Sequence, residues 1–256
     1  MRKERGIVMY GDFASVYDRL QDADYNSFVD YYERIFEKFG LKPKLVLDLA
    51  CGTGNITIPM AQRGYDMIGV DLSVEMLNIA REKAAESGQD ILFLNQDMTE
   101  FELYGTVDAA VCALDGVNYL TEDGDLGRLF ALVKNYLNFG GIMIFDINSA
   151  FKLKNILGNE TFVNEEDGIF YVWQNFWDEE RSVCCFELNF FEEQTDGSYL
   201  RFEEVQEERA YTVEEITAEA KRAGLFVEGV YKPFEFGDAN EQCDERIFFV
   251  VSRKND

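Results

Sequence analysis

The sequence Val46-Leu-Asp-Leu-Ala-Cys-Gly-Thr-Gly54 joins an apolar strand to a glycine-rich turn. In a parallel α/β sheet the first strand-to-helix turn lies at the carboxyl edge, where backbone N–H groups and a helix N-terminus face a ligand. Gly52 and Gly54 have no Cβ, so the backbone can adopt a positive φ and a ligand can approach it closely. The stretch therefore predicts an α/β fold with a cofactor site at this turn.

Asp71 ends a second apolar strand, seventeen residues after Gly54. A carboxylate at this position can accept hydrogen bonds from both hydroxyls of a ribose. The dinucleotide fingerprint G-x-G-x-x-G needs a third small residue at position 57, where the chain has Thr57, so a pyrophosphate ligand is disfavoured. Asp48 would repel a pyrophosphate, whereas it would offset the charge of a cationic ligand. A tight turn with a solvated aspartate is the plain structural alternative.

The nonapeptide resembles motif I of the class I methyltransferases that use S-adenosylmethionine, whose usual form is hydrophobic-hydrophobic-Asp/Glu-hydrophobic-small-Cys/Gly-Gly-x-Gly. The resemblance implies that Asp48 lies near the sulfonium and ammonium groups of this cofactor. It also implies that Ala50, Gly52 and Gly54 line the cofactor and that Asp71 binds its ribose.

Two later segments resemble the same family. The run Leu72-Ser-Val-Glu-Met-Leu-Asn-Ile-Ala-Arg81 is similar to the family's "D-x-S-x-x-M-L-x-x-A" pattern once Asp71 is included. By this resemblance Leu72 and Met76 flank the adenine. Asp97 and Met98 match the family's motif in which an aspartate contacts the adenine amino group and the next hydrophobic residue covers the ring.

Residues 107–120 are similar to the family's fourth strand and the floor of its active site. The resemblance implies that Leu114 contacts the cofactor. If the methyl acceptor is an amine, it must lose a proton before it attacks, and Asp115 and Tyr119 are the candidate bases. The alternatives are that bulk water takes the proton and that Asp115 only caps a turn.

The N-terminal run Met9-Tyr-Gly-Asp-Phe-Ala-Ser-Val-Tyr-Asp18 resembles the "Y-x-x-F-A-x-x-Y-D" opening of bacterial class I enzymes. In those enzymes the first helix folds over the cofactor, which makes Tyr10 and Tyr17 cofactor contacts by resemblance. Ordinary core packing is an equally good interpretation of both tyrosines. Asp12 is placed to cap a short helix that ends at Leu20.

Helical and strand patterns alternate up to about residue 148 and predict a doubly wound, mostly parallel sheet of seven strands. Two helix-capping signals are Ser73 and the run Thr212-Val-Glu-Glu215. Expected strands are 44–49, 65–71, 91–95, 107–113, 141–147, 225–231 and 246–252, and the main expected helices are 55–63, 74–86 and 122–138.

Between the fifth strand and the last helix the pattern changes to long β-type runs at 169–177, 182–194 and 199–209. We therefore expect an antiparallel insert at 158–209, which the resemblance to glycine and amino-sugar N-methyltransferases makes a lid or substrate wall. The domains are then a helical cap over the cofactor at 1–43, a core at 44–157 and 210–256, and the insert. The aromatic residues of the insert line either a substrate pocket or a plain core; they are Tyr171, Trp173, Phe176 and Trp177.

The composition excludes several functions. The chain has no histidine, which rules out Ser-His-Asp hydrolysis and histidine-based zinc sites, and we expect no metal. A net charge of −25 argues against nucleic acid as a partner. The five cysteines form no C-x-x-C pattern and are expected to be free thiols. Without a long apolar run or a signal-peptide pattern, we expect a cytoplasmic monomer or homodimer that does not bind membranes.

These features predict an S-adenosylmethionine-dependent methyltransferase that acts on a small molecule, with an amine as the favoured acceptor. Residues 158–215 carry 17 acidic residues and three arginines, which disfavours an anionic acceptor. An acidic surface that serves only solubility is the plain alternative. Two other functions stay open: methylation of RNA or protein, and a regulatory protein that binds the cofactor without turnover.

Overall fold

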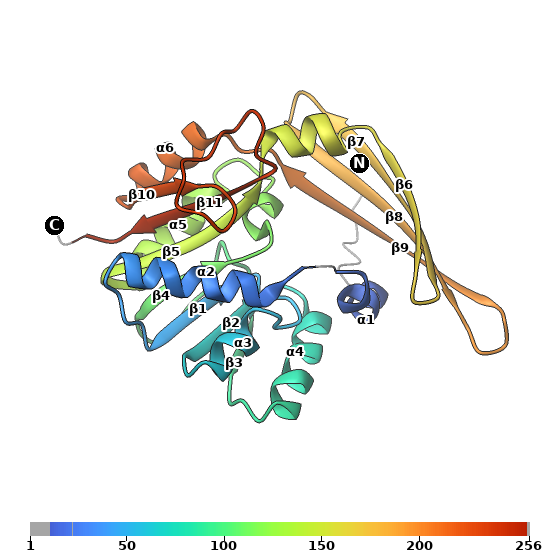
Figure 1. Cartoon of the computed structure of the whole chain (residues 1–256), viewed down its shortest axis with the longest axis horizontal. Coiled ribbons are helices and arrows are strands. Elements are labelled where there is room, and N and C mark those ends of the chain that lie inside the picture. Colours follow the sequence, from blue (N-terminus) through green and yellow to red (C-terminus); the bar gives the residue numbers. More distant parts are fainter. Residues whose placement is uncertain (1–10, 22, 255–256) are drawn as a thin grey trace, which may run out of the picture.

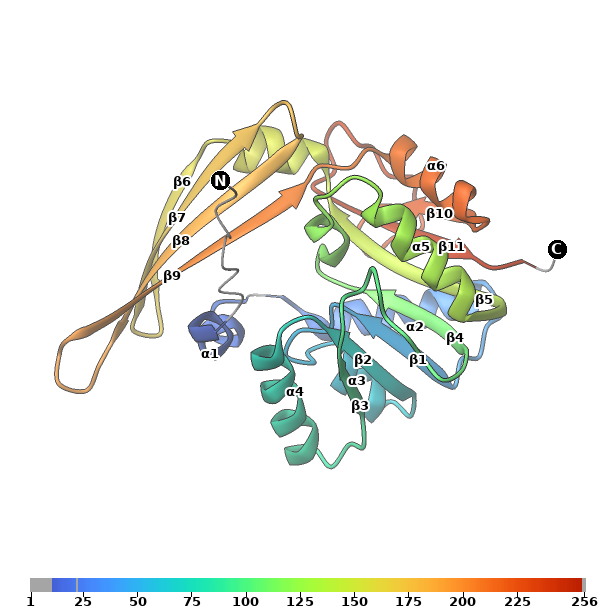
Figure 2. The same cartoon turned by 180° about the vertical axis from the view of Figure 1, so that it is seen from behind.

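The computed structural model describes residues 11–21 and 23–254. Within them, one sheet contains seven strands in the order β10-β11-β5-β4-β1-β2-β3 (Figures 1 and 2). The strands from β5 to β3 pair in parallel, and β11 runs antiparallel to both of its neighbours, which confirms the predicted sheet. The strands are β1 (Leu45–Leu49), β2 (Asp66–Asp71), β3 (Leu92–Asn95), β4 (Val107–Cys112), β5 (Leu137–Asn148), β10 (Phe226–Tyr231) and β11 (Arg246–Ser252).

Helices cover both faces of this sheet because each helix has an apolar side. α2 and α3 form one cluster with Val46, and α5 and α6 form another with Leu47, the next residue of β1, which points to the opposite face. α4 packs Leu77 against Phe93 of β3. The helices are α2 (Tyr25–Lys38), α3 (Thr57–Gln62), α4 (Val74–Glu86), α5 (Asp125–Tyr136) and α6 (Val213–Ala223).

The predicted caps can be checked against the helix ends. The Ser73 hydroxyl accepts a hydrogen bond from the Met76 N–H at 3.1 Å, and Thr212 forms the expected capping box with Glu215. Both caps are therefore confirmed. The prediction that Asp12 caps the first helix is wrong, because α1 (Gly11–Leu20) already includes Gly11 and Asp12 lies inside it.

The insert is a second, antiparallel sheet in the order β6-β7-β8-β9, which extends to one side of the core (Figures 1 and 2). The alternation in β8 is confirmed: Cys184, Phe186 and Phe190 are buried on one face, and Glu187 is exposed on the other. β6 was not expected, and all of its residues are exposed. The elements are the π-helix η2 (Lys152–Leu157), β6 (Thr161–Glu166), β7 (Ile169–Asp178), β8 (Val183–Glu193) and β9 (Tyr199–Arg209).

α1 lies between the core and the insert. Its Ala14 and Val16 are buried in a cluster with Met76 of α4 and with Phe190 and Phe202 of the insert. α2, in contrast, covers the core sheet. Of the two helices that the structure describes within the predicted cap at 1–43, α1 therefore packs between α4 and the insert, whereas α2 packs on the core sheet.

Candidate cofactor and acceptor site

The turn after β1 depends on its glycines for two different reasons. Ala50, Gly52 and Gly54 all have a positive φ, at 53°, 53° and 81°. A Cβ on Gly54 would lie 3.1 Å from Ile58 Cδ1 and 3.3 Å from Ala80 Cβ, so this glycine is needed for packing. A Cβ on Gly52 would meet no atom within 4 Å. The Gly52 side of the turn is therefore open to a ligand.

Asp71 connects the ends of β1 and β2. Its Oδ2 accepts a hydrogen bond from the Gly52 N–H, and its Oδ1 accepts one from the Ser73 N–H, both at 2.8 Å. Burial raises the pKa of Asp71, and the backbone hydrogen bonds oppose that rise. A carboxylate has about four acceptor positions, so each oxygen can still accept a hydroxyl. The geometry fits the predicted contact with a ribose.

Asp48 lies beneath the turn and is 1% exposed. The Thr57 hydroxyl donates to its Oδ2 at 2.6 Å. Burial raises the pKa of Asp48 to about 7, and the negative charge of Asp71 contributes to the rise. A cationic ligand nearby would favour the ionised carboxylate. Asp48 thus fits a cofactor that carries a positive charge.

The residues predicted around the adenine differ in access. Leu72 is 49% exposed beside Asp71, whereas Met76 is 3% exposed because α1 covers it. Asp97 accepts hydrogen bonds from the N–H and the hydroxyl of Thr99, both at 2.7 Å on Oδ1, and Met98 packs partly against the core. The structure brings Leu72, Asp97 and Met98 to one edge of the sheet and places Met76 in the contact with α1.

Sequence reasoning did not identify Asp18, which attaches α1 to the turn. Its Oδ1 accepts hydrogen bonds from Thr53 at 2.7 Å and Asn55 at 2.8 Å, and its Oδ2 pairs with Lys83 at 2.8 Å. Burial would raise the pKa of Asp18, but hydrogen bonds from Lys83, Thr53 and Asn55 outweigh it and lower that pKa. The sequence signal that could have identified Asp18 is its place at the end of the N-terminal family motif. Tyr17, the preceding residue, is partly buried in the α1 cluster, and Tyr10 lies outside the described residues.

The floor of the site follows β4 and has a strained backbone. Leu114 and Asp115 have positive φ values of 53° and 58°, which are unfavourable for residues other than glycine. Asp146, at the end of β5, stabilises this turn: its carboxylate accepts from the Leu114 N–H at 2.9 Å and from the Asp115 N–H at 3.1 Å. Burial raises the pKa of Asp146, and Arg246 opposes that rise.

The two candidate bases are both engaged. Asp115 forms an ion pair with Arg246 at 2.7 Å, and Arg246 also contacts Asp146. The Tyr119 hydroxyl donates to Gln206 Oε1 of β9 at 3.0 Å. An arginine keeps its proton at any physiological pH, so Asp115 already has a charged partner within the protein. The contacts favour a structural role for this carboxylate.

The region where β5 and β9 meet contains further buried polar groups, and sequence reasoning did not identify two of them, Asn148 and Glu208. Asn118 donates to the carbonyls of Asn148 at 3.0 Å and Arg209 at 2.9 Å. Asn148 Nδ2 donates in turn to Glu208 Oε2 at 2.7 Å, and Glu208 is 4% exposed. No local sequence pattern indicates these contacts, because the partners lie 30 to 91 residues apart.

The aromatic residues of β7 are divided between the two faces of the insert. Tyr171 packs against Phe190, and Trp173 packs against Phe186, on the buried face. Phe176 is 43% exposed on the outer face, so the prediction that it lines an interior pocket is wrong. Strand alternation explains the difference, because adjacent residues point to opposite faces.

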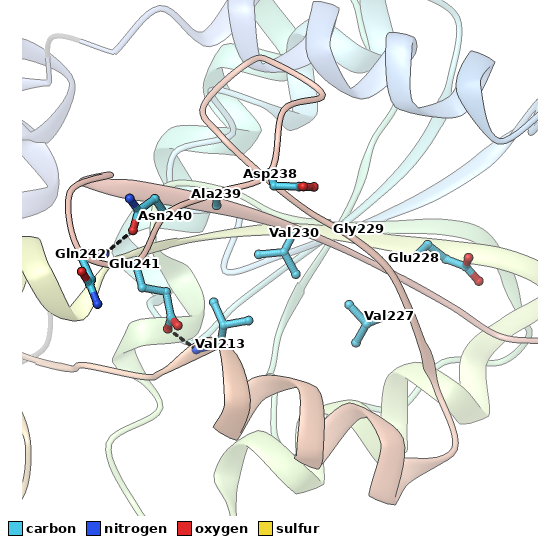
Figure 3. A pocket seen from close by; sticks show the side chains of 10 residues that line it. All are labelled: Val213, Val227, Glu228, Gly229, Val230, Asp238, Ala239, Asn240, Glu241 and Gln242. Atoms are coloured by element: carbon cyan, nitrogen blue, oxygen red, sulfur yellow. Dashed lines mark hydrogen bonds between the residues drawn. The ribbon is translucent and has the colours of Figure 1, made fainter.

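A hollow of about 560 Å³ lies at the other edge of the core sheet, beside β10 (Figure 3). Glu241 Oε1 accepts from the Val213 N–H at 2.5 Å, and Asn240 Oδ1 accepts from the Gln242 N–H at 3.1 Å. Its polar side chains thus stabilise the 238–242 loop, and none of its lining residues belongs to the turns around Asp71 and Asp115. We assign it no role in catalysis.

Comparison with known proteins identifies the family. A family described as "Methyltransferase domain" matches residues 46–141. The putative methyltransferase YqeM of Bacillus subtilis is 36% identical over 248 residues, which cover 96% of this chain and 98% of the relative. An S-adenosylmethionine-dependent methyltransferase from Clostridium acetobutylicum has a TM-score of 0.88 and 33% identity, over 96% of this chain and 99% of its own. The CcbJ methyltransferase of Streptomyces caelestis shares the fold at 20% identity, with a TM-score of 0.82 over 96% and 98% of the two chains.

Two general properties complete the description. None of the helices within residues 11–21 and 23–254 has the length and apolar character that a membrane crossing requires. The same residues contain no group of three or more cysteine, aspartate or glutamate side chains arranged for a metal ion. The relatives confirm the predicted family, enzyme class and cofactor. The chain belongs to the S-adenosylmethionine-dependent methyltransferases.

Proposed function

We propose that the protein methylates an amino group of a small molecule. In this proposal Asp71 binds the ribose of S-adenosylmethionine, the open side of Gly52 receives its methionine part, and Asp48 offsets its positive charge. When bound, the cofactor supplies a methyl group that its sulfonium has already activated. The protein then has to orient the acceptor and exclude water.

The observation that carries the amine proposal is the buried face of the insert. Along β9, Phe202, Glu204 and Glu208 are 8%, 4% and 4% exposed. Phe190 of β8 stacks on Phe202, and Phe186 of β8 lies opposite Gln206 of β9. Carboxylates and aromatic faces are the side chains that attract a cationic nitrogen. This face adjoins the floor of the site, because Tyr119 contacts Gln206.

Similar proteins support the same acceptor class. The fold resembles that of the sugar N-methyltransferase KedS8 from Streptoalloteichus, with a TM-score of 0.76 and 21% identity over the whole of both chains. A glycine/sarcosine N-methyltransferase of Parasynechococcus marenigrum is 31% identical over 144 residues, about half of each chain. Their names refer to small molecules with an amino group. For RNA as acceptor, the net charge of −25 is unfavourable.

We also infer a cytoplasmic location, as a monomer or homodimer. All five cysteines are free, and Cys51, Cys112 and Cys184 are buried. Free thiols are typical of proteins in reducing compartments.

Methyl transfer from labelled S-adenosylmethionine to a metabolite extract tests the proposal. We expect label in one or a few small amines and none in RNA or protein. Asp71→Ala, which we expect to weaken cofactor binding, is the matched negative control. Label that appears only in macromolecules would contradict the proposal. Cofactor binding without any conversion to S-adenosylhomocysteine would instead support a sensor.

A further inference from the structure

The carboxyl groups near the end of β4 fall into two classes according to their partners. Asp115 and Asp146 both pair with Arg246, which is a permanent cation. The hydrogen bond to Glu208 comes instead from a neutral amide, Asn148 Nδ2, at 2.7 Å. A carboxyl group with a neutral partner can gain and lose a proton without breaking an ion pair. Glu208 is thus better suited than Asp115 to exchange a proton.

Glu208 stands where the insert and the core meet. The neighbouring Arg209 carbonyl accepts from Asn118 of the floor, which fixes this end of β9 beside the Leu114–Asp115 turn. The side chain of Glu208 is on the same face of β9 as Glu204 and Gln206, and Gln206 accepts from Tyr119. The carboxyl group therefore lies on the acceptor side of the floor, next to the aromatic face of the insert.

The same face of the insert contains polar atoms that lack partners. Trp173 Nε1 and Asn175 Oδ1 are buried and have no hydrogen-bond partner, and Asn175 is 1% exposed. Both side chains are on the buried face of β7. Asn175 pairs with Phe186 of the neighbouring strand β8, and Phe186 pairs in turn with Gln206 of β9. A buried donor or acceptor without a partner costs about 1–3 kcal/mol, so a ligand with hydrogen-bonding groups would stabilise this face.

Charged groups on several neighbouring elements affect the pKa of Glu208. Burial raises the pKa of Glu208, and the negative charge of Asp115 raises it further. The Asn148 hydrogen bond and the positive charges of Lys152 and Arg246 oppose this rise. Cys184, opposite Glu208 on β8, also has a raised pKa, caused by burial and by Glu208. The balance leaves a carboxyl group that binds a proton more readily than an exposed glutamate.

We propose that Glu208 binds the ammonium group of the acceptor and takes its proton before methylation. This inference rests on the proposed function, because it requires an amine. The carboxylate oxygen forms an O–H bond as one N–H bond of the ammonium breaks, and the electron pair of that bond stays on nitrogen as the lone pair. Glu208 becomes the neutral acid, and the amine becomes a nucleophile.

The first test measures binding by tryptophan fluorescence. The chain has two tryptophans, and both are in the insert: Trp173 on the buried face, and Trp177, whose Nε1 donates to Glu179. Trp177→Phe leaves Trp173 as the only reporter. Methylamine, benzylamine and glucosamine are titrated in the presence of S-adenosylhomocysteine, with methanol, benzyl alcohol and glucose as matched neutral probes. We expect a saturable response to at least one amine and a weaker one to its alcohol. If no amine gives a saturable response, the inference is overturned.

The second test replaces the carboxyl group. Glu208→Gln should weaken binding of the responding amine by about ten-fold or more, since a charged hydrogen bond is lost. Binding of methylamine, which stays protonated over this range, should also strengthen between pH 6 and pH 9 as Glu208 ionises, and the variant should lack this rise. Glu207→Gln is the matched control, because Glu207 is the next residue of β9 and pairs with Arg181 on the surface at 2.9 Å. It should leave amine binding unchanged.

Calorimetry with S-adenosylmethionine shows whether each variant is folded. If Glu208→Gln does not bind the cofactor, Glu208→Asp replaces it in the test; unchanged amine binding in that variant would overturn the inference. If the protein methylates amines and Glu208→Gln does so at the same rate, the inference fails and the proposed function stands. If only alcohols are methylated, both fail.

Discussion

The proposed cofactor edge, around Gly52 and Asp71, and the proposed acceptor side, around Asp115 and Glu208, are built in different ways. At the cofactor edge, Asp71 binds the backbone N–H groups of Gly52 and Ser73, and its partners lie in short continuous segments. On the acceptor side, Asp115 pairs with Arg246, 131 residues away in the sequence. A site made of local backbone contacts can be recognised from a motif, whereas a site made of distant side chains becomes visible only in the folded chain.

The two regions also differ in what stabilises them. The cofactor edge uses backbone hydrogen bonds and glycines with positive φ, and Asp48 is its only fully buried carboxyl group among the described residues. The acceptor side contains Asp146 at 0% exposure and Glu208 at 4%, with Arg246 as the cation. A buried charge needs its partner, so stability should be more sensitive to substitution on the acceptor side.

The largest expected effect is therefore on Arg246. Arg246→Met would leave Asp115 and Asp146 without their cation, and removing one partner of a buried ion pair typically costs about 3–5 kcal/mol. We expect the free energy of unfolding, measured with urea, to fall by about 3 kcal/mol, because the arginine side chain keeps 19% exposure. Arg222→Met removes an exposed pair with Glu219 and is the control. A loss equal to that of the control would show that the two regions do not differ in this way.

The second effect concerns the ribose. Asp71→Ala removes a charged acceptor whose hydrogen bonds are worth about 1.5–3 kcal/mol. The dissociation constant of S-adenosylmethionine, measured by calorimetry, should rise about ten-fold to a hundred-fold. Asp66→Ala, at the exposed start of the same strand, is the control. An unchanged dissociation constant for Asp71→Ala would contradict the cofactor geometry.

These contrasts explain what could be read from the sequence. The turn after β1, α4 and the Ser73 and Thr212 caps were predictable because their causes lie within a few residues. β6 was missed because it has no alternating pattern and is exposed along its whole length. The alternation of β9 was visible, but the burial of Glu208 depends on Asn148, 60 residues earlier. Asp115 was taken as a candidate base because Arg246 could not be placed beside it from the sequence.

A third, smaller effect distinguishes the two glycines of the turn. Gly52→Ala should destabilise the unliganded protein by about 1 kcal/mol, the usual cost of a positive φ in a residue with a Cβ. Gly54→Ala should destabilise it more, because its Cβ would lie 3.1 Å from Ile58. Cofactor binding should show the opposite order, since the added methyl of Gly52→Ala points into the open side of the turn. Thermal unfolding and calorimetry measure both orders. The same order in both experiments would mean that the cofactor does not lie against Gly52.

The smallest expected effect is a pH dependence of cofactor binding caused by Asp48. Its folded pKa of about 7 is above the ordinary value of 3.8, so between these pH values the folded protein holds a proton that the unfolded chain has lost. The contribution of Asp48 to stability therefore falls as pH rises from about 4 to 7. A cationic cofactor prefers the ionised carboxylate, so its affinity should rise about three-fold from pH 6.5 to pH 7.5, and a proton should be released on binding at pH 6.

Calorimetry in two buffers with different heats of ionisation measures that proton. Asp48→Asn keeps the size of the side chain and an acceptor for Thr57, whose hydroxyl now donates to Asp48 Oδ2. This variant should bind the cofactor with an affinity that no longer changes with pH. If the pH dependence persists in Asp48→Asn, another group is responsible, and Asp71 is the next to test, because burial raises its pKa as well. Since both groups belong to the cofactor edge, Glu208→Gln should leave this pH dependence intact, which keeps the proton chemistry of the two regions separate.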